Sequence, residues 1–189
     1  PEIGSVGKAI EVDAKIFEPD FIPLLVAAPV LGRYCAFGNL FARMGIGSNG
    51  SIYRLDRHPS MSRHPTTPAD ESDLRLHLSR QTNKQSGLID ILQIEEDFPE
   101  TKAAVDKLIS DGNEIILFDA IYQQQMARIG TVIDSYSSED KTLFSVGSSG
   151  VEMALGAYWK ENGMIDTIPN WADAETDGPI LVVSGSCSP

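Results

Sequence analysis

Short apolar runs rich in branched residues alternate along this chain with longer segments whose apolar residues recur at helical spacing. One such run covers residues 21–28, and another covers 114–120, directly after a helical pattern over 100–110. Strands and helices that alternate in this order pack as parallel βαβ units. The sequence therefore predicts an α/β fold of three layers, α/β/α, in which helices cover both faces of a mostly parallel sheet.

The remaining segments extend the same pattern. We expect the strand at 87–92, the helix at 100–110 and the strand at 114–120 to form one complete βαβ unit. The glycine-rich segment 32–51 is ambiguous, and the proline-rich segment 58–68 is expected to be an ordered loop. Further helices are expected at 4–16, 70–82, 123–136 and 151–159, and further strands at 51–55, 142–146 and 180–183.

Charge and composition exclude several classes of partner. The formal net charge is -12, and no stretch gathers lysine and arginine into the stripe that binds a phosphate backbone, so nucleic acid is not expected. The longest apolar run, 21–30, is far shorter than the roughly 20 residues that span a bilayer, so no membrane partner is expected. The two cysteines, Cys35 and Cys187, favour buried side chains in a reducing compartment over a disulfide framework. We place the protein in the cytoplasm.

Two turns of small residues follow predicted strands and could receive an anion. Gly147, Ser148, Ser149 and Gly150 follow the strand at 142–146, and Ser184 to Ser186 follows the strand at 180–183. Such turns offer backbone amides at a helix N-terminus, where the helix dipole favours negative charge. Neither turn has the spacing of a nucleotide-binding fingerprint or of a serine-hydrolase elbow. An ordinary strand-to-helix turn remains the alternative for both.

Arg33 follows a buried strand, at the end of the sheet where ligands of α/β proteins bind. Its guanidinium could hold a carboxylate through two parallel hydrogen bonds, and Gly32, Gly38 and Asn39 lie nearby in the sequence. The alternative is that Arg33 pairs with one of the many acidic side chains and that the glycines only form turns.

The three histidines do not have the spacing of a metal site. His58 and His64 each precede a proline and are expected to be loop residues held by hydrogen bonds, and His77 is expected to be an exposed helix residue. We therefore predict no metal site in this chain.

Seven short motifs in a fixed order resemble the four-carbon acid sugar kinase family. Any one of them is a weak signal, but chance does not explain seven in the correct order and spacing. The motifs are P-E-I-G-S-V-G-K-A from Pro1, A-A-P-V-L-G-R-Y from Ala27, F-G-N-L-F-A from Phe37, R-H-P-T-T-P-A-D-E-S-D-L from Arg63, L-F-D-A from Leu117, V-G-S-S-G from Val146 and S-G-S-C-S-P from Ser184.

This resemblance implies an activity and a set of site residues. Members of the family transfer the γ-phosphoryl group of ATP to sugar acids such as threonate, erythronate or their oxo relatives. ATP and Mg²⁺ are expected for the full-length protein, and no cofactor is expected to bind tightly to this chain. The residues expected to bind the sugar acid are Gly4, Ser5, Gly7, Arg33, Asn39, His64 and Thr66. The residues expected near the nucleotide are Ser184, Ser186, Ser188, Gly147, Ser148 and Ser149.

The chain also departs from the family pattern, mainly at its ends. It lacks the first strand with its paired-aspartate, glycine and threonine motif, to which the resemblance assigns the catalytic base, and Ala69 replaces a methionine. We therefore expect a fold truncated at both ends, with 1–178 forming the C-terminal part of the sugar-acid domain and 179–189 opening the nucleotide-binding domain. Such a chain would be inactive alone and could form a homo-oligomer through an uncovered sheet edge. The alternative is a stand-alone, non-catalytic binding domain for a small acid or phosphate.

Overall fold

A four-stranded parallel sheet forms the centre of the computed structural model, which describes residues 6–45 and 49–165. The strand order is β5-β6-β1-β7, and each neighbouring pair is parallel. The predicted α/β class with a mostly parallel sheet is confirmed. The strands are β1 (Ile22–Leu25), β5 (Ser86–Ile89), β6 (Ile115–Phe118) and β7 (Val146–Gly147).

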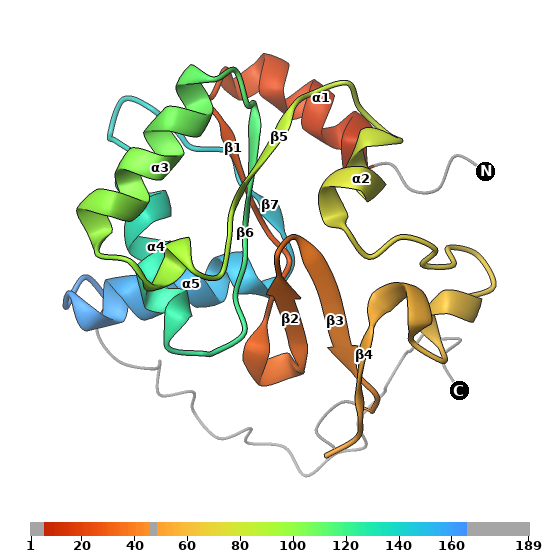
Figure 1. The fold of residues 1–189 in the computed structure, drawn as a ribbon. Helices are drawn as coiled ribbons and strands as arrows, with labels where there is room; N and C mark the ends of the chain where they lie inside the picture. Colours follow the sequence, from red (N-terminus) through yellow and green to blue (C-terminus); the bar gives the residue numbers. More distant parts are fainter. Residues whose placement is uncertain (1–5, 46–48, 166–189) are drawn as a thin grey trace, which may run out of the picture.

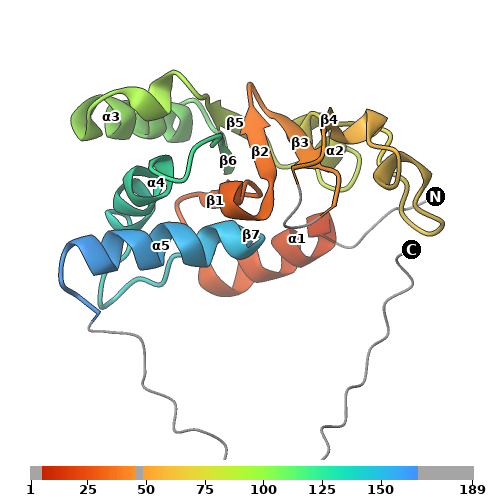
Figure 2. The same cartoon turned by 90° about the horizontal axis from the view of Figure 1, so that it is seen from below.

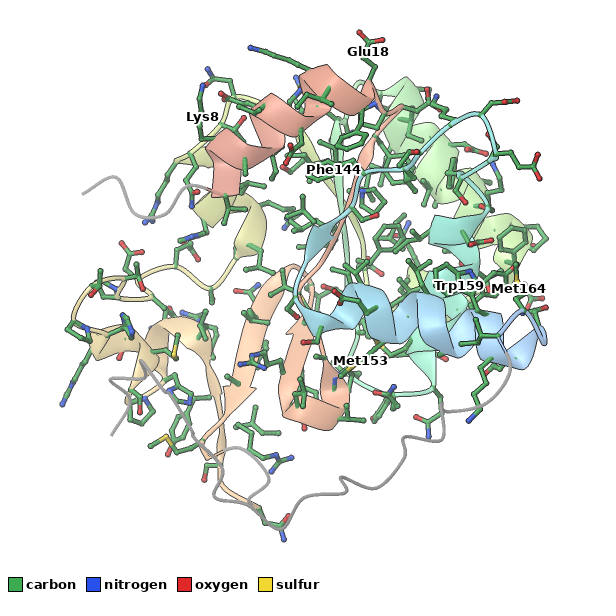
Figure 3. All side chains as sticks on the ribbon, turned by 180° about the vertical axis from the view of Figure 1, so that it is seen from behind. Lys8, Glu18, Phe144, Met153, Trp159 and Met164 are labelled. Atoms are coloured by element: carbon green, nitrogen blue, oxygen red, sulfur yellow. The ribbon has the colours of Figure 1, made fainter. Side chains whose placement is uncertain are left out.

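Helices lie on both sides of this sheet, as three layers require. Figure 2 shows α3 (Phe98–Ser110) and α4 (Gln125–Asp134) on one side, and α1 (Val6–Phe17) and α2 (Leu74–Ser79) on the other. The last helix, α5 (Ser149–Glu161), packs along α4, and the indole of Trp159 donates to the carboxylate of Asp134 at 2.9 Å (Figures 1 and 3).

The core lies between these layers and explains why two strands could be recognised easily. Every residue of β1 and β6 is buried, because helices or loops cover both faces of the central strands. Strands of this kind read as continuous apolar runs. The predicted βαβ unit is confirmed as β5, α3 and β6, and α3 ends before Gly112, which has a φ of +88°.

Two predicted boundaries are wrong for local reasons. The helix expected from Asp70 begins at Leu74, because the carboxylate of Asp73 caps it by accepting from the amides of Arg75 and Leu76. The strand expected at 142–146 is reduced to β7, since Phe144 packs against α1 before the strand starts. Its ring stacks on Phe17 with the two centroids 5.7 Å apart (Figure 3).

The ambiguous segment 32–51 forms most of a second, antiparallel sheet. In it, β2 (Arg33–Ala36) pairs with β3 (Asn39–Arg43), and β3 pairs with β4 (Ile52–Arg54). The strand predicted at 51–55 is therefore present, but it belongs to this small sheet.

Short 3-10 turns make up the remaining regular structure. Two of them lie in and beside the loop predicted at 58–68, which is ordered. None of the described helices is long and apolar enough to cross a membrane. The strand predicted at 180–183 lies outside the described residues. The turns are η1 (Pro29–Leu31), η2 (Leu55–Arg57), η3 (Met61–Arg63) and η4 (Gln93–Glu95).

Candidate functional site

Strand β2 lies across the carboxyl ends of two parallel strands and defines the candidate site. Near the end of β1, the amide of Arg33 donates to the carbonyl of Ala28 at 3.2 Å, and the amide of Ala28 donates back at 3.0 Å. Near the end of β6, Cys35 and Ala120 exchange a similar pair of bonds at 2.8 and 3.1 Å. In open α/β sheets, ligands bind at this carboxyl edge.

Arg33 is the basic residue of β2 at this edge. Its side chain is half-buried and shares one face of the strand with Cys35, because alternate residues of a strand point the same way. In the part of the chain that the structure describes, the guanidinium of Arg33 has no hydrogen bond or ion pair. The alternative in which an acidic neighbour holds Arg33 therefore has no support among the described residues.

The turn between β7 and α5 lies beside the same end of β1. The hydroxyl of Ser148 donates to the carbonyl of Val26 at 3.0 Å and accepts from the amide of Gly150 at 3.4 Å, so Ser148 caps α5. A Cβ atom at Gly147 would collide with the carbonyl oxygen of Leu25, and one at Gly150 with that of Ala27. The glycines thus have a packing role.

This placement brings two predicted groups of residues together. Arg33, expected at the sugar acid, pairs with Ala28, and the turn of Gly147, Ser148 and Ser149, expected at the nucleotide, approaches Leu25 to Ala27. Arg33 and this turn therefore both lie at the carboxyl end of β1.

Asn39 lies at the start of β3, where its side chain is already bonded. Its amide oxygen accepts from the hydroxyl of Ser72 at 2.8 Å, and its amide nitrogen donates to the carbonyl of Phe37 at 3.2 Å. In the structure, Asn39 thus joins the hairpin of β2 and β3 to the segment before α2.

His64 lies in an exposed loop with a defined hydrogen-bonding pattern. Its Nδ1 accepts from the amides of Thr66 at 3.4 Å and Thr67 at 3.0 Å. In the neutral ring the proton is therefore on Nε2, which can donate to a ligand.

The other two histidines have structural roles. His58 is only 6% exposed, and its Nδ1 accepts from the amides of Ser60 and Met61, as expected for a bonded loop histidine. His77 was expected to be exposed, but it is half-buried because it packs beside Gln81, 3.2 Å away. Among the described residues, no three side chains of His, Cys, Asp or Glu come together as a metal site would require.

Gly7 lies inside α1 and packs against Gln81, two residues after the end of α2. Its amide donates to the side-chain oxygen of Gln81 at 3.1 Å, and a Cβ atom at Gly7 would lie 2.5 Å from that of Gln81. This contact accounts for the glycine. The predicted site residues Gly4, Ser5, Ser184, Ser186 and Ser188 lie outside the described residues.

One residue at this edge was missed as an individual site candidate. Asp119 directly follows β6 and is 0% exposed, yet it is ionisable. Its carboxylate accepts from the amides of Gly38 and Ile91, each at 3.1 Å. Burial raises the pKa of Asp119, while the Cys35 thiol and three backbone amides oppose that shift. The signal in the sequence is an aspartate immediately after four apolar strand residues.

Taken as a class, this is an α/β domain whose polar edge lies at the carboxyl ends of a parallel sheet, the edge at which such sheets bind ligands. The chain belongs to the family of sugar-binding N-terminal domains, whose family model matches residues 2–155.

Its relatives include kinases that act on sugar acids, which confirms the resemblance. The chain is 40% identical over 190 aligned residues to the 3-oxo-isoapionate kinase of Paraburkholderia graminis, covering 100% of this chain and 38% of that protein. It is 26% identical over 185 residues to a 3-oxo-tetronate kinase of Salmonella typhimurium, covering 98% of this chain and 40% of that protein. The chain thus spans about two fifths of the length of these relatives.

Solved structures share the fold at lower identity. A protein from Salmonella typhimurium, described as a putative tRNA synthase, superimposes with a TM-score of 0.71 at 23% identity, covering 85% of this chain and 35% of that one. A Haemophilus influenzae protein of the family DUF1537 gives a TM-score of 0.70 at 21% identity, with the same two coverages of 85% and 35%. These likenesses establish the fold alone.

Proposed function

We propose that this chain supplies the sugar-acid-binding part of an ATP-dependent kinase for a four-carbon sugar acid of the threonate, erythronate or oxo-tetronate type. The observation that carries the proposal is the half-buried Arg33 at the carboxyl edge of the sheet, with no partner for its guanidinium among the described residues. The kinase activity of the relatives supports the reaction, and the negative charge of a sugar acid fits this arginine.

In this proposal the substrate carboxylate takes two parallel hydrogen bonds from Arg33. His64 offers its Nε2 proton to an oxygen of the same substrate, and Thr66 helps to hold the ring in that orientation. Gly4, Ser5, Gly7 and Asn39 complete the proposed substrate-binding set. Their roles follow from the family resemblance alone.

ATP would supply the transferred phosphoryl group, with Mg²⁺ neutralising its charge. The amides of the turn at Gly147, Ser148 and Ser149 suit a phosphate, although the hydroxyl of Ser148 already bonds to Val26. The described residues hold no cluster of metal ligands, so we assign none of them to Mg²⁺. Ser184, Ser186 and Ser188 complete the proposed nucleotide-binding set, and 179–189 would open the nucleotide-binding domain.

The test is an ATP-coupled assay of the full-length protein with threonate, erythronate and 3-oxo-tetronate, and with erythritol as the matched neutral control. We expect turnover with at least one acid and none with erythritol, because only the acids present a carboxylate to Arg33. The 189-residue chain alone should give no turnover. Binding of the acids without phosphorylation by the full-length protein would favour the second candidate, a non-catalytic binding domain.

A further inference from the structure

Asp119 connects three separate segments at the carboxyl edge of the sheet. One carboxylate oxygen accepts from the amide of Gly38 in the hairpin, and the other accepts from the amide of Ile91 after β5, each at 3.1 Å. A buried charge needs such partners, because an unpaired one would cost several kcal/mol.

The hairpin that Asp119 holds has an unfavourable turn. Phe37 and Gly38 form a two-residue connection between β2 and β3, and both have positive φ, +50° and +80°. Such turns strongly prefer asparagine or aspartate before glycine, and a phenylalanine with positive φ is strained. The guanidinium of Arg75 adds support from outside, lying 3.1 Å from the position of a Cβ atom on Gly38. The turn is thus held by its surroundings.

The same strand carries the proposed substrate anchor. Cys35, whose backbone pairs with Ala120 directly after Asp119, lies two residues after Arg33 on the same face of β2. The position of Arg33 therefore depends on how β2 is fixed over the sheet. Near β1, the backbone bonds between Arg33 and Ala28 fix β2. Near β6, β2 is fixed by the backbone bonds between Cys35 and Ala120, and the following turn by the bond from Gly38 to Asp119.

We propose that Asp119 is a positioning residue for the sugar-acid site, which acts by fixing the β2–β3 hairpin and thereby the guanidinium of Arg33. This inference rests on the proposed function. Asp119 itself is 0% exposed, so in this proposal it acts through the hairpin and not through the substrate.

The test is a double-mutant cycle in the full-length enzyme with Asp119→Asn and Arg33→Lys. Asparagine has nearly the same shape as aspartate and keeps one acceptor oxygen, but its amide group faces a backbone donor. The hydrogen bonds that hold the hairpin are therefore weakened. We expect Asp119→Asn to raise KM for the sugar acid about tenfold, with kcat nearly unchanged, because a displaced Arg33 loses substrate binding. In the Arg33→Lys background, Asp119→Asn should have little further effect, because both changes remove the same interaction.

Asp90 provides a matched control, since it also follows a strand at this edge. Among the residues that the structure describes, its carboxylate accepts only from the nearby amides of Leu92 and Gln93, at 2.9 and 3.0 Å. Asp90→Asn should therefore leave KM within about twofold of the parent enzyme.

Two results would overturn the inference. One is an unchanged KM in Asp119→Asn. The other is a double variant whose KM rises by the product of the two single-variant factors, as it would for independent residues. If Asp119→Asn is not recovered folded, Phe37→Asn is added to relax the turn, and loss of folding in that variant too would show that Asp119 serves the whole domain instead. A parent enzyme without sugar-acid turnover would contradict the proposed function. Failure of the proposed function can thus be distinguished from failure of the inference about Asp119.

Discussion

Phe37 is the residue whose conformation fits its sequence least well. Its φ is +50° and its side chain is 54% exposed, so the ring gains little from burial while the backbone is strained. Strain of this kind costs about 1–3 kcal/mol and persists only where the surroundings impose it. Asp119 provides those surroundings by accepting from the amide of Gly38, and the guanidinium of Arg75 lies where a Cβ atom on Gly38 would point.

Replacing Phe37 with asparagine should stabilise the protein. Asparagine tolerates positive φ and is preferred before glycine in such turns, so Phe37→Asn should raise the free energy of unfolding by about 1 kcal/mol. Chemical denaturation of both proteins measures this difference. A lower stability of the variant would mean that the exposed ring makes a contact more valuable than the strain it causes.

Single residues also show where sequence reasoning stops. The hydrogen-bonded roles of His58 and His64 could be predicted because each precedes a proline in a loop, and both amides that bond to each ring are close in sequence. The contacts of Asp119 could not be predicted, since Gly38 lies 81 residues away in the chain. Only the fold brings them together.

At the scale of helices and strands, the fully buried strands are predicted more accurately from the sequence than the half-buried ones. Strands β1 and β6 were recognisable because both faces are covered and every residue is apolar. The hairpin of β2 and β3 was not, because its residues are mostly half-buried and its turn lacks the usual asparagine. The sequence predicts a site at the carboxyl edge, but it does not predict the strand that lies across this edge.

Two glycines of α5 provide a direct test of how this helix meets the sheet. A Cβ atom at Gly150 would collide with the carbonyl oxygen of Ala27, whereas one at Gly156 would have nothing within 4 Å. Gly150→Ala should therefore destabilise the protein by about 1–3 kcal/mol, because the helix must move away from β1. Gly156→Ala, the matched control in the same helix, should stabilise it by about 0.5–1 kcal/mol.

Thermal unfolding of the two variants beside the parent protein measures both effects. A similar change in melting temperature for both substitutions would contradict the close approach of α5 to β1. This approach places the turn of Gly147 to Ser149 beside the end of β1, just before Ala28, the backbone partner of Arg33.

For the whole molecule, charge is distributed unevenly. Residues 21–68 contain five arginines and one acidic residue, Asp56, although the whole chain carries a net charge of -12. Asp56 is already paired with Arg54 at 2.6 Å. The small antiparallel sheet and its loop therefore form a basic region in an acidic protein, which favours the approach of an anionic substrate.

The outer face of α1 predicts self-association of the 189-residue chain. Val12 and Ile16 are one helical turn apart and are 45% and 66% exposed, while Ile10 on the opposite face is buried in the core. A helix that is apolar on two faces is normally covered on both. Light scattering should therefore detect dimers or larger species, and Ile16→Lys should reduce them. A monodisperse parent monomer would contradict this expectation.

The central claim is that Arg33 holds the substrate carboxylate, and one measurement tests it most directly. This measurement is the KM of the full-length enzyme for its sugar acid with Arg33→Lys, beside Arg80→Lys as a control at an exposed ion pair with Asp70. Lysine keeps the charge but loses the two parallel donors, so KM should rise roughly tenfold to a hundredfold with kcat nearly unchanged, while Arg80→Lys changes neither. An unchanged KM in Arg33→Lys, together with a lowered melting temperature, would contradict the account and make Arg33 a structural residue.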